Sequence, residues 1–387
     1  MKTLRSGRNR RKWIYVLLLM GLLGLSGCGS PSSASVEMSS QTELVKTGSM
    51  ELQYAENFAV DYYEDGYKML TTLPDSKRYL LVPEGQPVPK GLDEDVSILQ
   101  EPLQNIYLVA SGVMDMFASV DAVDQIRFSG QKQENWYIQT AKDAMAAGDM
   151  IYAGKYSKPD YELLVSEGCD LAIENRMITH SPEVVEMLQS FDIPVMIEYS
   201  SYEQHPLGKV EWVKFFGALT GKEAEAEEAF AEQTEILEKV ESGEKTGKTI
   251  AFFYVTSNGL IQVRQSTDYI PKLIELAGGR YIFEDLEDSG SGRSTLNMQV
   301  EDFYAGARDA DILIYNSSID GGVTTLDELI GKCNILKDFK AVQEGQVYCT
   351  TNDMYQQSMA IGYLLQDMHT VLTDDDTAKL RYLFLLQ

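Results

Sequence analysis

The chain has only three histidines and four cysteines among 387 residues, which limits the metal chemistry it can support. The histidines, at positions 180, 205 and 369, stand far apart. Zinc sites are usually built from four His or Cys ligands at short spacings, and no such spacing is present. We therefore predict no metal-ligating set of side chains.

The cysteines also give little support for a disulfide framework. Cys28 follows an apolar leader and is assigned a different role below, so the remaining three cannot all pair. Cys169 precedes an apolar run and is interpreted as a core residue. A bridge between Cys333 and Cys349 stays open from the sequence alone.

Motifs of phosphate binding and nucleophilic catalysis are missing as well. The chain has no Walker loop, no nucleophile elbow and no glycine-rich dinucleotide loop after a strand. Carboxylates are abundant, but the pattern distinguishes no pair for acid–base chemistry. We predict no catalytic residue, and the protein is not expected to be an enzyme.

Basic residues are scarce relative to acidic ones. The 33 Lys and Arg residues against 59 Asp and Glu residues give a formal charge of −26. Nucleic-acid binding depends on many lysines and arginines that neutralise phosphates, so nucleic acid is not expected as a partner. The same charge favours solubility and permits a cationic partner.

Only one long apolar run is present, from Trp13 to Leu25, and it is too short to span a bilayer stably. Six basic residues precede it, and Leu25-Ser26-Gly27-Cys28 follows. This layout is typical of a lipoprotein signal. It predicts a signal peptide over residues 1–27, cleavage before Cys28 and a lipid on its sulfur. The alternative is an ordinary signal peptide, or an uncleaved anchor, with a chance cysteine. The first interpretation places the protein at the extracytoplasmic face of the cell membrane.

Beyond the leader, the pattern predicts an α/β fold. Residues 28–48, rich in Ser and Thr, are interpreted as a flexible tether. A β-hairpin is expected from Phe58–Tyr63 and Tyr67–Thr72 around Glu64-Asp65-Gly66. Strand–helix alternation then predicts two Rossmann-like lobes with parallel sheets, over residues 49–205 (with the leading hairpin) and 222–387. A long rigid helix over residues 206–221 is expected to join them.

From about Asn105 to the end, the chain resembles the substrate-binding lipoproteins of ABC importers for iron–siderophores, haem and cobalamin. The resemblance rests on four blocks in the family's order and spacing: Leu108-Val109-Ala110-Ser111 with Asp124-Gln125-Ile126; Ala153-Gly154-Lys155-Tyr156 with Pro159 to Leu164 and Gly168 to Ile173; Leu219 to Glu225; and Leu276 to Gly279 with Gln299 to Phe303 and Asp309 to Ile314. One departure is Gly168-Cys169-Asp170 in place of the family's Lys-Pro-Asp. Another is the long stretch Phe128–Met150, in which Trp136 and Tyr137 are expected to cover the cleft.

The resemblance implies a solute receptor with an inter-lobe cleft, an ABC permease and its ATPase as partners, and no covalent cofactor. Glu162 and Glu301 match the family's exposed glutamates, one on each lobe, that dock into permease arginines; the alternative is that both are ordinary solvated helix residues. The expected ligand is a metal chelate, an iron–siderophore before haem or cobalamin. The protein is expected to be a monomer.

Ligand-binding candidates are polar residues expected near the carboxyl ends of the strands. Arginines suit an anionic chelate and tyrosines offer flat faces with a polar tip, although packing residues and surface ion pairs use the same residue types. The candidates are Ser111, Arg176, Tyr199 and Tyr202 on the first lobe, and Arg264, Tyr269, Asn316 and Tyr355 on the second. His180 and Met354 are weaker candidates as haem or iron ligands. A lipid-anchored hydrolase and an adhesive lipoprotein are the alternatives from other classes.

Overall fold

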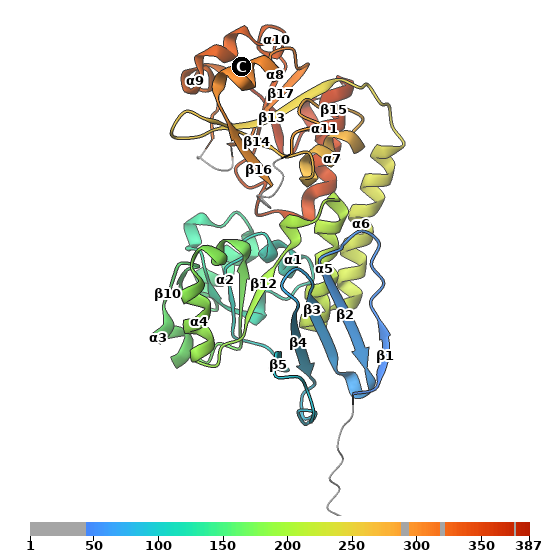
Figure 1. The fold of residues 1–387 in the computed structure, drawn as a ribbon, viewed down its shortest axis with the longest axis vertical. Helices are drawn as coiled ribbons and strands as arrows, with labels where there is room; N and C mark the ends of the chain where they lie inside the picture. Colours follow the sequence, from blue (N-terminus) through green and yellow to red (C-terminus); the bar gives the residue numbers. More distant parts are fainter. Residues whose placement is uncertain (1–43, 288–293, 318–321, 375–376) are drawn as a thin grey trace, which may run out of the picture. The chain divides into compact units, whose positions relative to one another are not determined.

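The computed structural model describes residues 44–287, 294–317, 322–374 and 377–387 (Figure 1). The predicted leader, Cys28 and most of the predicted tether lie outside the described residues. Thr42–Gln387 forms one compact unit that contains every described element. Among the described helices, none combines the length and apolarity that crossing a membrane requires.

The first sheet has five strands in the order β1-β2-β3-β4-β5, which makes it larger than the expected hairpin. The strands are β1 (Lys46–Ser49), β2 (Phe58–Tyr63), β3 (Lys68–Thr72), β4 (Lys77–Val82) and β5 (Val96–Gln100). The hairpin itself is confirmed, because β2 and β3 pair antiparallel. Its turn places Asp65 and Gly66 in the left-handed region, at φ 58° and 85°. Residues 46–48, predicted as tether, belong to β1 and pair with β2, so regular structure begins earlier than expected.

The first α/β lobe contains a fully parallel sheet in the order β12-β11-β6-β7-β8. Its strands are β6 (Ile106–Leu108), β7 (Ile126–Ser129), β8 (Ile151–Tyr152), β11 (Leu171–Asn175) and β12 (Val195–Glu198). The helices are α1 (Val113–Ser119), α2 (Gln139–Ala147), α3 (Tyr161–Ser166) and α4 (Pro182–Ser190), and β9 (Gly154–Lys155) pairs with β10 (Lys158–Pro159). Ile106 and Leu108 enter one apolar cluster and Tyr107 enters another, so this sheet is covered on both faces.

The second lobe contains a seven-stranded sheet whose predicted parallel strands are confirmed and are extended by antiparallel ones. β13 (Thr249–Val255), β15 (Arg280–Tyr281), β17 (Ile312–Tyr315) and β18 (Val347–Thr350) are parallel, whereas β14 (Ile261–Arg264), β16 (Thr295–Met298) and β19 (Leu383–Leu385) join antiparallel. The helices are α7 (Tyr269–Leu276), α8 (Val300–Ala307), α9 (Leu326–Lys332), α10 (Lys340–Gln343) and α11 (Ile361–Thr373).

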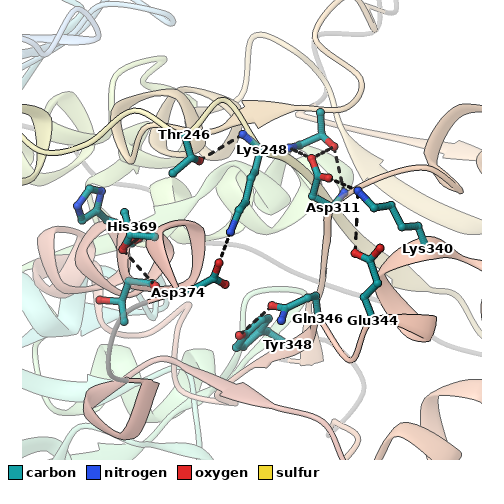
Figure 2. A network of polar contacts seen from close by, with 12 residues as sticks. Thr246, Lys248, Asp311, Lys340, Glu344, Gln346, Tyr348, His369 and Asp374 are labelled. Atoms are coloured by element: carbon teal, nitrogen blue, oxygen red, sulfur yellow. Dashed lines mark hydrogen bonds and ion pairs between the residues drawn. The ribbon is translucent and has the colours of Figure 1, made fainter.

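Polar side chains interact at the side of the second sheet where its parallel strands begin (Figure 2). Asp311, just before β17, accepts hydrogen bonds from the Thr249 N–H and hydroxyl at 2.7 and 2.9 Å and pairs with Lys340. Burial alone would raise the pKa of Asp311, but these bonds outweigh burial and lower it. Lys248 pairs with Asp374 at 2.6 Å beside this group. These contacts fix the edge at which the strands begin and leave their carboxyl ends for a binding site.

Two packed helices join the lobes where one was expected. α5 (Pro206–Thr220) contacts α1 in the first lobe and α7 and α11 in the second, and α6 (Glu223–Glu241) packs along α5 (Figure 1). Every residue of α5 from Pro206 to Leu219 is buried. The helix ends at Gly221, whose φ of 71° suits a left-handed cap. A joint built from a buried helix and a second helix packed along it is stiffer than one built from loose strands.

The segment of residues 50–57 between β1 and β2, here called the strap, is bound to the joint by two buried carboxylates. Glu211 of α5 accepts the backbone N–H groups of residues 53–55 at 2.8–3.1 Å. Glu203 accepts those of residues 56 and 57 at 2.9 and 3.0 Å, and the Trp212 indole N–H at 2.8 Å. Glu211 and Glu203 are 0% and 2% exposed. Buried carboxylates satisfied in this way hold a strand-free segment in place.

The two cysteines whose pairing the sequence left open are both present as thiols, so the Cys333–Cys349 bridge is not formed. Cys169 packs at the edge of a first-lobe apolar cluster, as expected of a core residue.

Replacing Glu211 by Gln should lower the free energy of unfolding by about 3 kcal/mol. The amide nitrogen of Gln would face N–H donors, and Lys214, 3.5 Å away, would lose a buried counter-charge. The measurement is urea denaturation of both proteins. Glu235→Gln, at an exposed position of α6, is the matched control and should change stability by less than about 0.5 kcal/mol. Equal stability of the Glu211 variant and wild type would contradict this account of the strap.

Candidate functional site

A cleft of about 800 Å³ lies at the carboxyl ends of three neighbouring first-lobe strands. Residues that follow β6, β11 and β12 form most of its wall, α5 contributes Lys209, and Tyr355 and Ser358 come from the second lobe. The strand order reverses between β6 and β11, and ligands of open α/β sheets bind at such switch points. The volume falls within the range of small-molecule sites. The cleft is therefore the candidate binding site.

Arg176 and Tyr202 form the most distinctive feature of the first-lobe wall. Asn175 caps the short helix that carries Arg176 by accepting the Met177 N–H at 2.9 Å. The Arg176 guanidinium stands 4.4 Å from the centre of the Tyr202 ring, a cation–π arrangement. Ser111 lines the same wall. Together they present a cation, a flat ring and a hydroxyl to the cleft.

Tyr355 faces the cleft from the second lobe and is held from behind by polar residues. Its hydroxyl accepts hydrogen bonds from Arg264 and from Asn316, the latter at 2.6 Å. Arg264 also pairs with Asp268 at 3.2 Å. Burial raises the pKa of the Tyr355 hydroxyl and keeps it protonated at neutral pH. This network fixes one orientation of the tyrosine.

The eight predicted ligand-binding residues thus divide into two groups. Those that line the cleft are Ser111, Arg176, Tyr202 and Tyr355. The others, Tyr199, Arg264, Tyr269 and Asn316, are no more than 8% exposed and lie behind the wall. Tyr199 supports Tyr202 with its ring centre 6.5 Å away. The structure therefore gives Arg264 a supporting position in place of the expected exposed one.

Sequence reasoning missed Lys209 and Glu198, which both line the cleft. Lys209 is the fourth residue of α5, and Glu198 is the last residue of β12. Both are buried, at 5% and 6% exposure. Lysines are seldom fully buried, so a lysine within the helix predicted to join the lobes was a signal available in the sequence.

Trp136 does not cover the cleft, contrary to expectation. Its side chain is 1% exposed, belongs to the main apolar cluster and donates its indole N–H to the Ser129 hydroxyl at 3.0 Å. The neighbouring backbone instead meets the second lobe. Gln356 accepts the Tyr137 N–H at 2.8 Å and donates to the Asn135 carbonyl at 2.7 Å. The long segment therefore bridges the lobes beside the cleft.

Asp115 of α1 forms a further inter-lobe contact. It accepts the Met359 N–H at 2.7 Å. Burial raises the pKa of Asp115 to about 6, although the Met359 bond and Lys209 act in the opposite direction. The Asp115 carboxyl group therefore changes its charge within an accessible pH range.

Among the described residues, no group of three or more His, Cys, Asp and Glu side chains is placed to hold a metal ion. His180 lines the cleft, His205 stacks on Tyr54 at 4.5 Å and caps α5, and His369 contacts the Ala277 carbonyl. Only His180 is placed to meet a ligand in this cleft. Met354 is 6% exposed and is not part of the cleft wall.

Two α/β lobes around a helical joint, with a cleft beside that joint, define the class of helix-linked binding proteins. The periplasmic binding protein family model matches residues 109–354, more than half of the chain, and the chain belongs to this family. The first sheet lies outside the matched residues.

Solved structures show the same fold. A possible iron-binding, periplasmic solute-binding protein of Staphylococcus epidermidis has a TM-score of 0.54 at 17% identity, and the match covers 70% of this chain and 98% of that one. The periplasmic haem-binding protein HutB of Vibrio cholerae has a TM-score of 0.55 at 14% identity, covering 69% and 98%. An uncharacterized lipoprotein of Methanocaldococcus jannaschii is 24% identical over 93% of this chain and 92% of its own length.

Replacing Asp115 by Asn should remove a pH-dependent part of the stability. The pKa of Asp115 is higher in the folded chain than its ordinary value of 3.8, so the folded state binds more protons between about pH 4 and pH 6. The wild type should therefore lose about 2 kcal/mol relative to Asp115→Asn as the pH rises from 4 to 7. Urea denaturation at four pH values measures this difference. The exposed control Asp124→Asn should show no such trend, and a flat difference for Asp115→Asn would refute the assignment.

Proposed function

We propose that the protein is the lipid-anchored receptor of an ABC importer and that it captures an iron–siderophore complex in the cleft described above. The family consists of binding proteins, and the cleft wall carries binding groups: the cation Arg176 stacked on Tyr202 is the observation that supports this ligand class best. An arginine and a tyrosine together suit the charged oxygens and flat rings of a ferric chelate. The protein would carry out no chemistry on the ligand.

Haem is the second candidate because His180 lines the same cleft and imidazole is a common iron ligand. Three of the solved structures with this fold carry haem-binding in their names, but their identity to this chain is at most 15%. A corrinoid fits less well. It would gain support from a cleft lined by tyrosines and Trp136, whereas Trp136 is packed in the core.

The proposed anchor is the lipid on Cys28, which would hold the receptor at the extracytoplasmic face of the membrane. The lipoprotein name of the Methanocaldococcus jannaschii relative, which aligns with most of this chain, supports this proposal. The large net negative charge favours a monomer. Its proposed partner is an ABC permease, whose ATPase would power release of the ligand.

The proposed docking residues occupy equivalent local positions on the two lobes. Glu162 is the second residue of α3 and Glu301 the second residue of α8, and both are exposed. Neither forms an ion pair within the part of the chain that the structure describes. The helix dipole favours a carboxylate in the first turn of a helix, and this effect needs no hydrogen bond to the carboxylate oxygens. The oxygens therefore stay available for arginines of a permease.

Ligand screening by thermal shift tests the receptor proposal. The full-length chain in detergent is heated with ferric catecholate, hydroxamate and polycarboxylate chelates, haem and cobalamin. A ligand at 100 times its Kd stabilises the native state by about 2.7 kcal/mol, so a clear rise in Tm is expected with a ferric chelate. Arg176→Ala should reduce that rise, and Arg280→Ala, at an exposed position of the second lobe, should not. No rise in Tm with any ligand of the panel would refute the metal-chelate proposal. A rise in Tm with cobalamin alone would change the ligand class.

Replacing Glu162 and Glu301 by Gln should impair delivery but leave binding intact. Each variant loses one charge-assisted contact to the permease, so ligand uptake should fall about tenfold per site while the ligand Kd stays the same. Uptake into vesicles that carry the permease and ATPase measures delivery, and calorimetry measures Kd. Glu235→Gln on α6 is the charge-matched control. Unchanged uptake in the double variant would exclude these residues from docking.

A further inference from the structure

Lys209 is a buried cation with an aromatic contact but no ion-pair or hydrogen-bond partner among the described residues. Its side chain lines the cleft and is only 5% exposed. Across the described ranges, no carboxylate lies within 4.0 Å of its ammonium group and no acceptor is within hydrogen-bond distance. The ammonium group stands over the ring of Tyr269, whose centre is 4.8 Å away. Buried lysines are rare unless they are paired, because desolvating an ammonium group is costly.

The three carboxylates that interact electrostatically with Lys209 are already engaged elsewhere. Asp115 accepts the Met359 N–H at 2.7 Å. Glu198 accepts the N–H and the hydroxyl of Ser200 at 2.8 and 2.5 Å. Asp268 accepts Arg264 at 3.2 Å and the Ile270 N–H at 2.9 Å. They balance the charge of Lys209 at a distance but do not complete its hydrogen bonds. Burial therefore lowers the pKa of Lys209 in the absence of a ligand.

A second unsatisfied donor lines the same cleft. The Ser358 hydroxyl is buried and has no hydrogen-bond partner. Ser358 belongs to a short helical turn, Ser358–Ala360, that packs against α5, the helix carrying Lys209. Gly112 leaves room beside it, because a Cβ there would come within 2.7 Å of this hydroxyl. The floor of the cleft thus offers two unused donors, one of them cationic.

We propose that Lys209 binds an acidic oxygen of the ligand at the floor of the cleft, with Ser358 as a second donor. This inference rests on the proposed function and narrows its substrate class to anionic chelates with carboxylate or catecholate oxygens. Such an oxygen supplies the missing partner of Lys209, and Arg176 supplies a second cation at the wall. A neutral ferric tris-hydroxamate would leave the buried ammonium unpaired and would bind more weakly.

The test replaces Lys209 by Met, which keeps the length of the side chain and removes its charge. Calorimetry on the full-length chain in detergent compares an anionic ferric tris-catecholate, a ferric polycarboxylate and a neutral ferric tris-hydroxamate. The variant should bind at least one of the anionic chelates 10- to 100-fold more weakly and the neutral chelate within about threefold of wild type. Its Tm without ligand should be equal or higher, since a desolvated charge has been removed. Lys272→Met, at an exposed lysine of α7, is the control and should change neither value.

The outcomes separate this inference from the receptor proposal. Unchanged binding of anionic chelates by the variant overturns the inference, as does an equal loss for neutral and anionic chelates. Binding of the neutral chelate alone by the wild type leaves the receptor function standing and overturns the anionic class. Absence of binding to every chelate overturns both. A lowered Tm without ligand would show that Lys209 is a structural residue, and this result also overturns the inference.

Discussion

The capture of consecutive backbone N–H groups by buried carboxylates is the interaction on which the rest of this structure depends. Glu211 and Glu203 hold the strap, residues 50–57, against the helical joint. Asp367 of α11 does the same for residues 381–383 at 2.6–3.0 Å. Each carboxylate satisfies several donors that a loop would otherwise bury unpaired. The strap can therefore cross the apolar core as irregular backbone, and the chain is held in place where β19 begins.

The bonding of α5 to the strap also affects the binding site, because it requires α5 to be buried. A helix that packs between two lobes and also holds the strap must be buried on all sides, and the residues from Pro206 to Leu219 are. Its polar side chains must then find partners inside the protein. Glu211 finds the strap and Lys214 finds Glu211 and Glu227. Lys209 alone faces the cleft, where a ligand is the group best placed to complete its contacts.

Much of the fold could be predicted because its buried strands are short apolar runs between turn signals. The hairpin of β2 and β3 and the helix α5 follow the sequence pattern closely. The extent of the first sheet could not be predicted. β1 is the exposed, polar run Lys-Thr-Gly-Ser, and β5 stands beyond a long loop, so neither shows the alternation of a half-buried strand. The antiparallel strands of the second sheet were missed because pairing direction leaves little trace in composition.

The site was partly predictable for a related reason. The carboxyl ends of parallel strands meet at one edge, so Ser111, Arg176 and Tyr202 could be placed there by their position after strands. Arg264 ends β14 and Asn316 follows β17, yet Tyr355 stands in front of both, and only packing in three dimensions reveals that order. Lys209 comes from a helix, so a position after a strand could not indicate that it lines the cleft.

The strap also determines how a pull on the chain travels through the protein. Force applied ahead of β1 reaches the strap through that strand, and the strap is bonded to Glu211 of α5 and to Glu203 just before α5. The Met50 N–H also donates to the Val60 carbonyl of β2, so the load is shared between the helical joint and the first sheet. None of the residues in these bonds lines the cleft, so a pull at this end of the chain acts on residues outside the binding site.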